Sequence, residues 1–326
     1  MEFKAKLDKA DRIILSELDR NCRVPASRLA RLARKSRQSV EYRIRRLVGE
    51  GIITSFNAAI NPHKMGYKIY KLYLQLRNIP ERRKALFSHL RASGSVYWMG
   101  ECDGVWDLIF GVFCESDRAF YDLKNRVISD FADIIVRSDG DIYVDVMQYP
   151  KMYFTGELRA PAMFAGTTVQ NGMDRLDHAI LAEMVNNARI PLTELASKVR
   201  SSPPTVSARL RRMESLGIII QYRIGVDLGK LGLEMYKAII YIDRYTAKDE
   251  KELLAYISSI PNVQYYIRNI WTMEPEFVVA GYHEYYGIMN GLKMRFPRVI
   301  RNVESVLLKS DEWTPGFRNL LESKGR

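Results

Sequence analysis

The sequence is poor in cysteine and has no long apolar run. Only three of its 326 residues are cysteines, Cys22, Cys102 and Cys114, and they form no Cys-x-x-Cys pair and no Cys/His cluster. This excludes a disulfide framework and a zinc finger, and it predicts a reducing, cytoplasmic location. No apolar run approaches the ~20 residues of a membrane-spanning helix, so no membrane partner is expected. The charged opening MEFKAKLDKADR lacks the apolar core of a secretory signal, so export is not expected.

Histidine and catalytic motifs are equally scarce. The four histidines fall in no HxxxH or HExxH motif and at no matched repeat positions, and each is expected on the surface or in a wing: His63, His89, His178 and His283. The sequence contains no GxxxxGK[ST], GxGxxG or GxSxG motif. It therefore predicts no enzyme, no metal site and no cofactor.

What the chain does have is an uneven positive charge. Lysine and arginine number 50 against 38 acidic residues, a net charge of +12. Residues 1–61 carry 14 basic and 7 acidic side chains, and residues 173–224 carry 8 and 5, whereas residues 62–150 carry 12 of each. Two short blocks thus hold most of the excess, which points to a polyanionic partner.

The two basic blocks are copies of each other. At an offset of 166, residues 7–53 align without a gap with residues 173–219, and 19 of 47 positions are identical. The register continues to the matched pairs Gly66/Gly232 and Tyr70/Tyr236. The chain is therefore a tandem duplication whose unit contains more than the basic block.

Each block has the pattern of three helices and a strand. In copy one, Val40, Ile44 and Leu47 form the buried stripe of a third helix with Ser36 as its N-cap. In copy two the same helix starts with Pro203 and Pro204. The segment from Thr54 to Ile60 is typical of a strand, which completes a winged helix-turn-helix.

The third helix carries the polar side chains that suit DNA. Those that project outward or flank its stripe are predicted to bind DNA, with their counterparts in copy two: Ser36, Arg37, Gln38, Ser39, Glu41, Tyr42, Arg45, Arg46, Ser202, Thr205, Ser207, Arg211 and Arg212. The alternative is that this face is merely solvated. Arg43 and Arg209 lie nearer the stripe, and internal pairing with an acid of the first helix is equally open for them.

Residues 66–150 contain strand-like and helix-like stretches, and their succession predicts the order βαββαβ. The expected elements are strands at 68–77, 96–99, 106–114 and 134–146 and helices at 80–92 and 117–132. Copy two repeats the order over residues 235–308. This is a ferredoxin-like α+β arrangement with helices on one face of a four-stranded sheet. The bare faces of the two sheets can cover each other, so we expect them to pair within the chain or with a second chain.

These motifs resemble a known family. The strings LDxxDRxILxEL, RxPxxxLA and SxxxVxxRIRRLxxEGII, followed by Asn61-Pro62, are similar to the N-terminal half of the Lrp/AsnC, or feast/famine, transcription regulators, and the βαββαβ unit resembles their effector-binding RAM domain. The resemblance covers nearly the whole chain in tandem. The expected units are a winged helix-turn-helix at 1–61, a RAM-like domain at 62–150, a linker at 151–172, a second winged helix-turn-helix at 173–224, a second RAM-like domain at 225–310 and a tail at 311–326.

The resemblance implies the function and the partners. It implies a sequence-specific regulator that binds double-stranded DNA, forms homo-oligomers and responds to a small effector such as an amino acid. The effector site would lie at the turn between the second and third RAM strands, here Gly100, Asp103, Gly104 and Asp107, with Trp106 where the family has tyrosine. The alternative is that these glycines only permit a tight turn. The copy-two turn has Pro275 and no glycine, so it is expected to be structural.

Two further hypotheses remain open. Siroheme decarboxylases share this two-part architecture, but they would need histidine and basic residues lining a tetrapyrrole cleft, and histidine is sparse here. A ligand-binding or scaffold protein with relic helix-turn-helix units is the third, and the +7 block of copy one weighs against it.

Overall fold

Each copy begins with three helices and one strand. The computed structural model describes residues 3–309, 312–313 and 316–325. The elements are α1 (Lys9–Arg20), α2 (Ala26–Ala33), α3 (Arg37–Gly49) and β1 (Ile53–Ile60) in copy one, and α6 (Arg175–Met184), α7 (Leu192–Lys198), α8 (Pro203–Ser215) and β7 (Ile219–Val226) in copy two. The predicted helix-turn-helix order is confirmed in both copies.

The helix ends follow from local side-chain chemistry. Asp8 and Asp174 cap α1 and α6, each in a reciprocal capping box with the aspartate three residues later. Ser36 and Ser202 cap α3 and α8 by accepting a hydrogen bond from a backbone N–H of the first turn. Between the second and third helices, one residue adopts the left-handed conformation: Arg34 at φ 51° in copy one and Arg200 at φ 52° in copy two. The repeat therefore preserves the turn as well as the helices.

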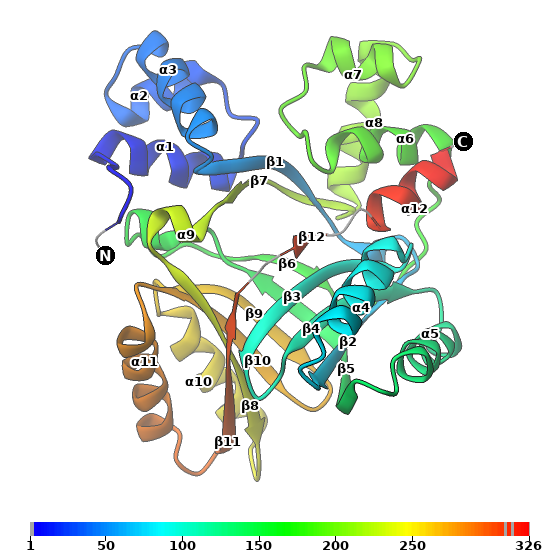
Figure 1. Ribbon diagram of the computed structural model, residues 1–326. Coiled ribbons are helices and arrows are strands. Elements are labelled where there is room, and N and C mark those ends of the chain that lie inside the picture. The colour runs from blue at the N-terminus through cyan, green and yellow to red at the C-terminus, as the bar shows by residue number, and fades with distance from the viewer. Residues whose placement is uncertain (1–2, 310–311, 314–315, 326) are drawn as a thin grey trace.

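The strand after each helical unit pairs with its counterpart in the other copy. β1 and β7 form a two-stranded antiparallel sheet in which Ala58 lies opposite Tyr222 and Asn57 opposite Arg223. In Figure 1 this ribbon runs between the helical units and the large sheet below them. The two helix-turn-helix units are thus joined by backbone hydrogen bonds, and the strand ladder fixes how far apart α3 and α8 lie.

The second part of each copy has the predicted order βαββαβ. In copy one it comprises β2 (Lys68–Leu76), α4 (Pro80–Ala92), β3 (Val96–Gly104), β4 (Leu108–Cys114), α5 (Asp117–Asp130) and β5 (Ile135–Gln148). In copy two it comprises β8 (Glu234–Ile242), α10 (Ala247–Ser258), β9 (Val263–Asn269), β10 (Met273–Val279), α11 (Tyr282–Arg295) and β11 (Ile300–Leu308). Two short turns, η1 (Pro62–Lys64) and α9 (Leu228–Leu231), connect the parts.

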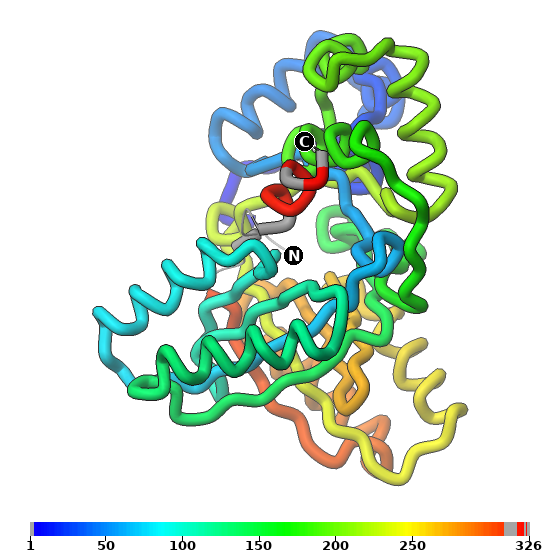
Figure 2. The backbone as a smooth tube through the Cα atoms, turned by 90° about the vertical axis from the view of Figure 1, so that its right-hand side faces the viewer, coloured from blue at the N-terminus to red at the C-terminus, as the bar shows by residue number. Residues whose placement is uncertain are grey.

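The two four-stranded sheets close into one barrel. The strand order is β11-β8-β10-β9-β5-β2-β4-β3, and β11 also pairs with β3, where Val306 lies opposite Gly104. The other seam is between β5 and β9, where Val146 lies opposite Ile267. Helices α4, α5, α10 and α11 cover the outside of the sheets (Figures 1 and 2). The prediction that the sheets pair is confirmed in its intrachain form, because closure leaves neither inner face open.

The segments expected as a linker and a tail both contain secondary structure. Residues 151–172 include η2 (Met152–Phe154) and β6 (Ala162–Ala165), and β6 pairs with β5. Near the C-terminal end, β12 (Glu312–Trp313) pairs with β3 and α12 (Gly316–Gly325) packs on α6, with Leu321 fully buried. These segments pack on the barrel and on the helix-turn-helix units, so they are part of the folded structure.

The expectation for His63 is wrong. Its side chain is 2% exposed, its Nδ1 lies 2.6 Å from the carbonyl oxygen of Gly166, and its Nε2 accepts from the N–H of Ile69. Burial lowers the pKa of this imidazole. His63 is therefore a neutral group that holds the segment around Gly166 against β2. Within the described residues, no helix combines the length and the apolar character needed to cross a membrane.

Candidate functional site

The predicted DNA-binding face of α3 is exposed. The Arg37 side chain is 72% exposed and pairs at 2.8 Å with Glu41, one turn further along the helix. Tyr42 is 62% exposed, and Arg45 is exposed and forms no hydrogen bond or ion pair with any described residue. A surface pair such as Arg37–Glu41 contributes under about 1 kcal/mol, so it yields readily to a phosphate or a base edge. Gln38 is exposed and Ser39 half-buried on the first turn of the same helix.

Two arginines of the third helix turn inward instead. Arg43 lies 2.7 Å from Asp11 and 2.8 Å from Asp8, so the internal pairing left open by the sequence is the one that forms. Arg46 also contacts Asp11, at 2.8 Å, and its side chain is 30% exposed. Asp11 is 1% exposed, and these two guanidinium groups provide its compensating charge. Arg46 is thus a less available DNA ligand than Arg45.

Copy two repeats this inward pairing but presents a poorer outer face. Arg209 and Arg212 contact the buried Asp177 at 3.2 and 3.0 Å, and Arg212 also donates to the carbonyl oxygen of Gly172. Arg211 is exposed and donates to Ser207. The Ser202 hydroxyl lies 2.8 Å from that of Thr205, both at the helix start. At that start, prolines replace the two side chains of copy one that can donate to a base.

Two of the four predicted effector residues, Asp103 and Gly104, lie where β3 pairs with β11 of the other copy. Gly104 adopts φ +133°, and a Cβ at this position would lie 2.6 Å from the carbonyl oxygen of Ser305. Glycine is therefore required for the close approach of β11. Gly100 is buried within β3, and Asp103 is exposed with Lys309 at 3.7 Å.

Asp107 is already occupied by contacts within copy one. One carboxylate oxygen accepts from the N–H of Leu76 at 2.8 Å, and the other accepts from Arg83 at 3.1 Å. These contacts give Asp107 a role in joining β2, α4 and the turn. That it binds an ammonium group stays a prediction, as does the whole four-residue effector site.

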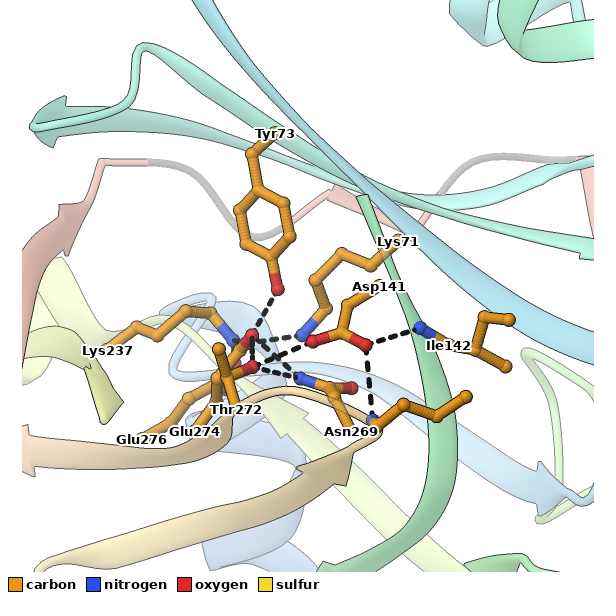
Figure 3. Close-up of polar contacts among 10 residues, drawn as sticks. Lys71, Tyr73, Asp141, Ile142, Lys237, Asn269, Thr272, Glu274 and Glu276 are labelled. Atoms are coloured by element: carbon orange, nitrogen blue, oxygen red, sulfur yellow. Dashed lines mark hydrogen bonds and ion pairs between the residues drawn. The ribbon is translucent and has the colours of Figure 1, made fainter. Parts of the chain in front are cut away.

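The copy-two turn contributes to a buried polar cluster inside the barrel. Figure 3 shows Lys71 and Lys237 meeting the carboxylate of Glu274, at 2.6 and 3.0 Å, with Tyr73 donating to the same group. Glu276 pairs with Lys237. Lys71, Lys237 and Glu274 are fully buried. The cluster joins the two sheets, because Lys71 and Tyr73 come from copy one and the other three residues from copy two.

Neutral donors complete the cluster. Asn269 donates to Glu274 at 2.7 Å, and Thr272 donates to Asp141 at 3.0 Å. Burial opposes the charge of Glu274, but Lys71 and Lys237 outweigh it and lower its pKa to about 2. The pKa of Asp141 is raised, by burial first and then by the nearby Glu274 charge, because its hydrogen bonds with Ile142 and Thr272 and the charge of Lys71 do not outweigh these effects.

Sequence reasoning missed this cluster although a sign of it was present. Lys71 and Lys237 occupy matched repeat positions within apolar strands, and Glu274 and Glu276 flank Pro275 in the apolar strand MEPEFVV. Buried charges in such strands require partners. In the strand pairing, Lys237 lies opposite Glu276, and Lys71 lies between Gly111 on β4 and Asp141 on β5. The ion pair of Lys71 nevertheless forms across the barrel, with Glu274.

Comparison with known proteins identifies the class of the helical units. Residues 173–214 match the AsnC-type helix-turn-helix domain, and residues 7–54 match a winged helix-turn-helix DNA-binding domain. The HTH-type transcriptional regulator LrpC of Bacillus subtilis is 37% identical over 98 residues, which are 29% of this chain and 65% of LrpC. An uncharacterized HTH-type transcriptional regulator of Pyrococcus horikoshii is 33% identical over 131 residues, which are 40% of this chain and 80% of that protein. The chain belongs to the Lrp/AsnC family of HTH-type transcriptional regulators.

A solved structure shares the fold over its full length. The siroheme decarboxylase NirDL superposes with a TM-score of 0.64 and 12% sequence identity, covering 97% of this chain and 98% of that chain. At this identity the likeness concerns the fold alone. The alignment with LrpC leaves about a third of that regulator unmatched.

Proposed function

We propose that this protein is a transcription regulator that binds double-stranded DNA in a sequence-specific manner. The observation that carries the proposal is the outer face of α3, where Arg37, Gln38, Tyr42 and Arg45 are exposed on a well-capped helix. Such a face presents side chains that can read base edges and phosphates in the major groove. Membership of a family of named regulators supports the same conclusion.

The two helical units contribute unequally in this proposal. Copy one reads bases through Arg37 and Gln38, together with Ser36, Ser39, Glu41 and Tyr42. Copy two mainly contacts phosphate through Arg211, with Ser202, Thr205 and Ser207 at the same surface. Arg46 and Arg212 serve mostly to hold the helix against Asp11 and Asp177, and they contact phosphate only at their exposed edges.

In this proposal the protein is a regulator and not an enzyme, and two of its histidines have structural contacts. His63 makes two internal hydrogen bonds and His89 packs against Phe131. The competing function is that of a siroheme decarboxylase, favoured only by the full-length fold match. An absorption spectrum recorded after siroheme is added distinguishes the two functions. A decarboxylase would shift the absorption bands of siroheme on binding it and would then convert it to product.

We place the protein in the cytoplasm, and we expect chains to associate further. Two neighbouring aromatic side chains on α11 support such association: Tyr282 and Tyr286 are 59% and 57% exposed, and their ring centroids lie 6.1 Å apart. Light scattering coupled to size exclusion measures the assembly directly.

The experiment that tests DNA binding compares two exposed arginines. Arg45→Ala should weaken binding to every duplex and reduce the slope of log affinity against log salt by about 1, because the variant neutralises one phosphate fewer. Arg118→Ala is the matched control, since Arg118 is 80% exposed on α5, a helix that covers the barrel. Fluorescence anisotropy over a salt series measures the affinity and the salt dependence of both variants. Equal losses from the two variants would refute the proposed interface.

A further inference from the structure

A cavity of about 250 Å³ lies between the paired strands that join the helical units and the top of the barrel. Its walls come from β1 and β7 above, from barrel strands including β8, β9 and β10 below, and from the segment around η2 at the side. In Figure 1, β1 and β7 lie where the helical units join the barrel. A molecule of about ten to fifteen non-hydrogen atoms would fill this volume. None of the four predicted effector residues lines it.

The charge of the lining has one sign. Among the described residues, Lys151, Arg223 and Arg318 line the cavity, and no aspartate or glutamate does. Lys151 is 8% exposed and Arg223 is 5% exposed, so two of these cations are buried. The remaining wall is largely apolar and aromatic. This combination suits an anionic group attached to an apolar body.

Arg223 is held in place with part of its guanidinium toward the cavity. Its Nε and Nη2 donate to the fully buried Asp19 at 3.2 and 3.4 Å, and Lys151 donates to the same carboxylate. The remaining nitrogen, Nη1, lies 3.5 Å from the hydroxyl of Tyr265, which also lines the cavity. Asp19 stands outside the lining and fixes the guanidinium from behind. A carboxylate in the cavity would therefore meet an already oriented donor.

A tyrosine hydroxyl is buried at the same end of the cavity. Tyr153 lines the cavity and is 7% exposed, and its hydroxyl makes no hydrogen bond with any described residue. A buried hydroxyl without a partner costs about 1–3 kcal/mol, so its presence points to a missing acceptor or donor. The amide oxygen of Asn57, on the β1 wall, is also buried and accepts no hydrogen bond within the part of the chain that the structure describes.

We propose that this cavity binds a small organic acid with an apolar or aromatic body and no amino group, such as a 2-oxo acid. Arg223 Nη1 and the Tyr153 hydroxyl bind its carboxylate, and the barrel wall packs on its body. An amino acid is disfavoured, because the lining offers no carboxylate among the described residues to pair with its ammonium group.

The position of the site suggests what the ligand does. Asp19 belongs to α1 of copy one, Arg223 to β7 of copy two, and Lys151 to the segment that leaves the first barrel half. A ligand bound at this junction changes the docking of the joined helical units on the barrel and so alters DNA affinity. This second part rests on the proposed function, whereas binding itself does not.

Binding is tested on the full chain without DNA. Calorimetry should give one site per chain for phenylpyruvate, with L-phenylalanine binding at least about tenfold more weakly; 4-methyl-2-oxopentanoate and L-leucine form a second matched pair. Tyr153→Phe should weaken phenylpyruvate binding about tenfold, because it removes one hydrogen bond to a charged group. Tyr266→Phe is the control, since the buried Tyr266 hydroxyl also lacks a hydrogen-bond partner among the described residues but lies outside the cavity lining.

Each result decides the proposal. Equal or tighter binding of the amino acids, no binding of either acid at millimolar concentrations, or an equal response of Tyr153→Phe and Tyr266→Phe would overturn it. So would tight binding of iron uroporphyrin that Tyr153→Phe weakens, since the carboxylates would then belong to a tetrapyrrole. If phenylpyruvate binds but leaves DNA affinity unchanged, the site stands and only its regulatory role fails. If DNA is not bound at all, the proposed function fails while the ligand result still stands.

Discussion

Glu274 is the residue whose charge most affects the barrel interior. Its carboxylate faces Lys71 and Lys237, and all three side chains are fully buried. Glu274→Gln preserves the shape but removes the carboxylate that both buried ammonium groups contact, leaving Glu276 and Asp141 as the nearby acids. We expect a loss of about 3 kcal/mol in the free energy of unfolding, measured by urea denaturation. Glu252→Gln, in an exposed pair with Lys248, should change it by less than about 0.5 kcal/mol. A small effect at Glu274 would show that the cluster is solvated.

The same carboxylate gives the stability a pH dependence. The pKa of Glu274 is about 2 in the folded protein against an ordinary value of 4.5, so its contribution is complete above pH 4.5. That contribution, on the order of 3 kcal/mol, is lost as the pH falls from 4.5 toward 2. Asp141 acts in the opposite sense, because burial raises its pKa. Urea unfolding between pH 5 and 3 should show a steeper loss in the native protein than in Glu274→Gln, and parallel curves would contradict this assignment.

Residues with local partners could be predicted from the sequence, and residues with distant partners could not. Ser36 as an N-cap depends on a backbone group three residues away, so spacing alone identified it. Lys71 and Glu274 lie 203 residues apart, and their contact depends on how two sheets close. The burial of His63 could not be predicted for the same reason, since its partner Gly166 lies 103 residues further along the chain.

At the scale of elements, the seam between β3 and β11 depends on Gly104. Gly104→Ala would force an alanine to φ +133° and place its Cβ 2.6 Å from a backbone oxygen of β11. We expect a loss of about 2 kcal/mol or more in unfolding free energy, with faster hydrogen exchange along β11. Gly94→Ala is the control, because a Cβ there meets nothing within 4 Å. Equal stability of the two variants would mean that the seam is open in solution.

The two recognition helices should differ in what they read. Arg37→Ala or Gln38→Ala should each reduce discrimination between sequences by about 1–3 kcal/mol, the usual value of one hydrogen-bonded base. The corresponding positions in copy two are Pro203 and Pro204, which have no side-chain donor. Arg211→Ala should therefore weaken binding to all sequences alike. Competition binding with variant duplexes measures both effects, and equal loss of discrimination from the two copies would contradict the ranking.

At the scale of the whole molecule, the duplication is visible in the sequence but its assembly is only partly so. The matched blocks and the βαββαβ order predict two units with bare sheet faces, and the closed barrel satisfies them. The pairing of β1 with β7 could not be predicted, because either strand taken alone fits the wing of its own unit. The packing of the C-terminal segment could not be predicted because its partners, β3 and α6, lie far away in the sequence.

Selection from a random duplex pool shows whether the chain reads DNA sequence through α3. The full chain should enrich a defined motif, with binding that weakens steeply as salt rises. The double variant Arg37→Ala, Gln38→Ala should still bind duplex but lose most of that enrichment. A pool that stays random with the native chain, or a motif that survives in the double variant, would contradict the claim.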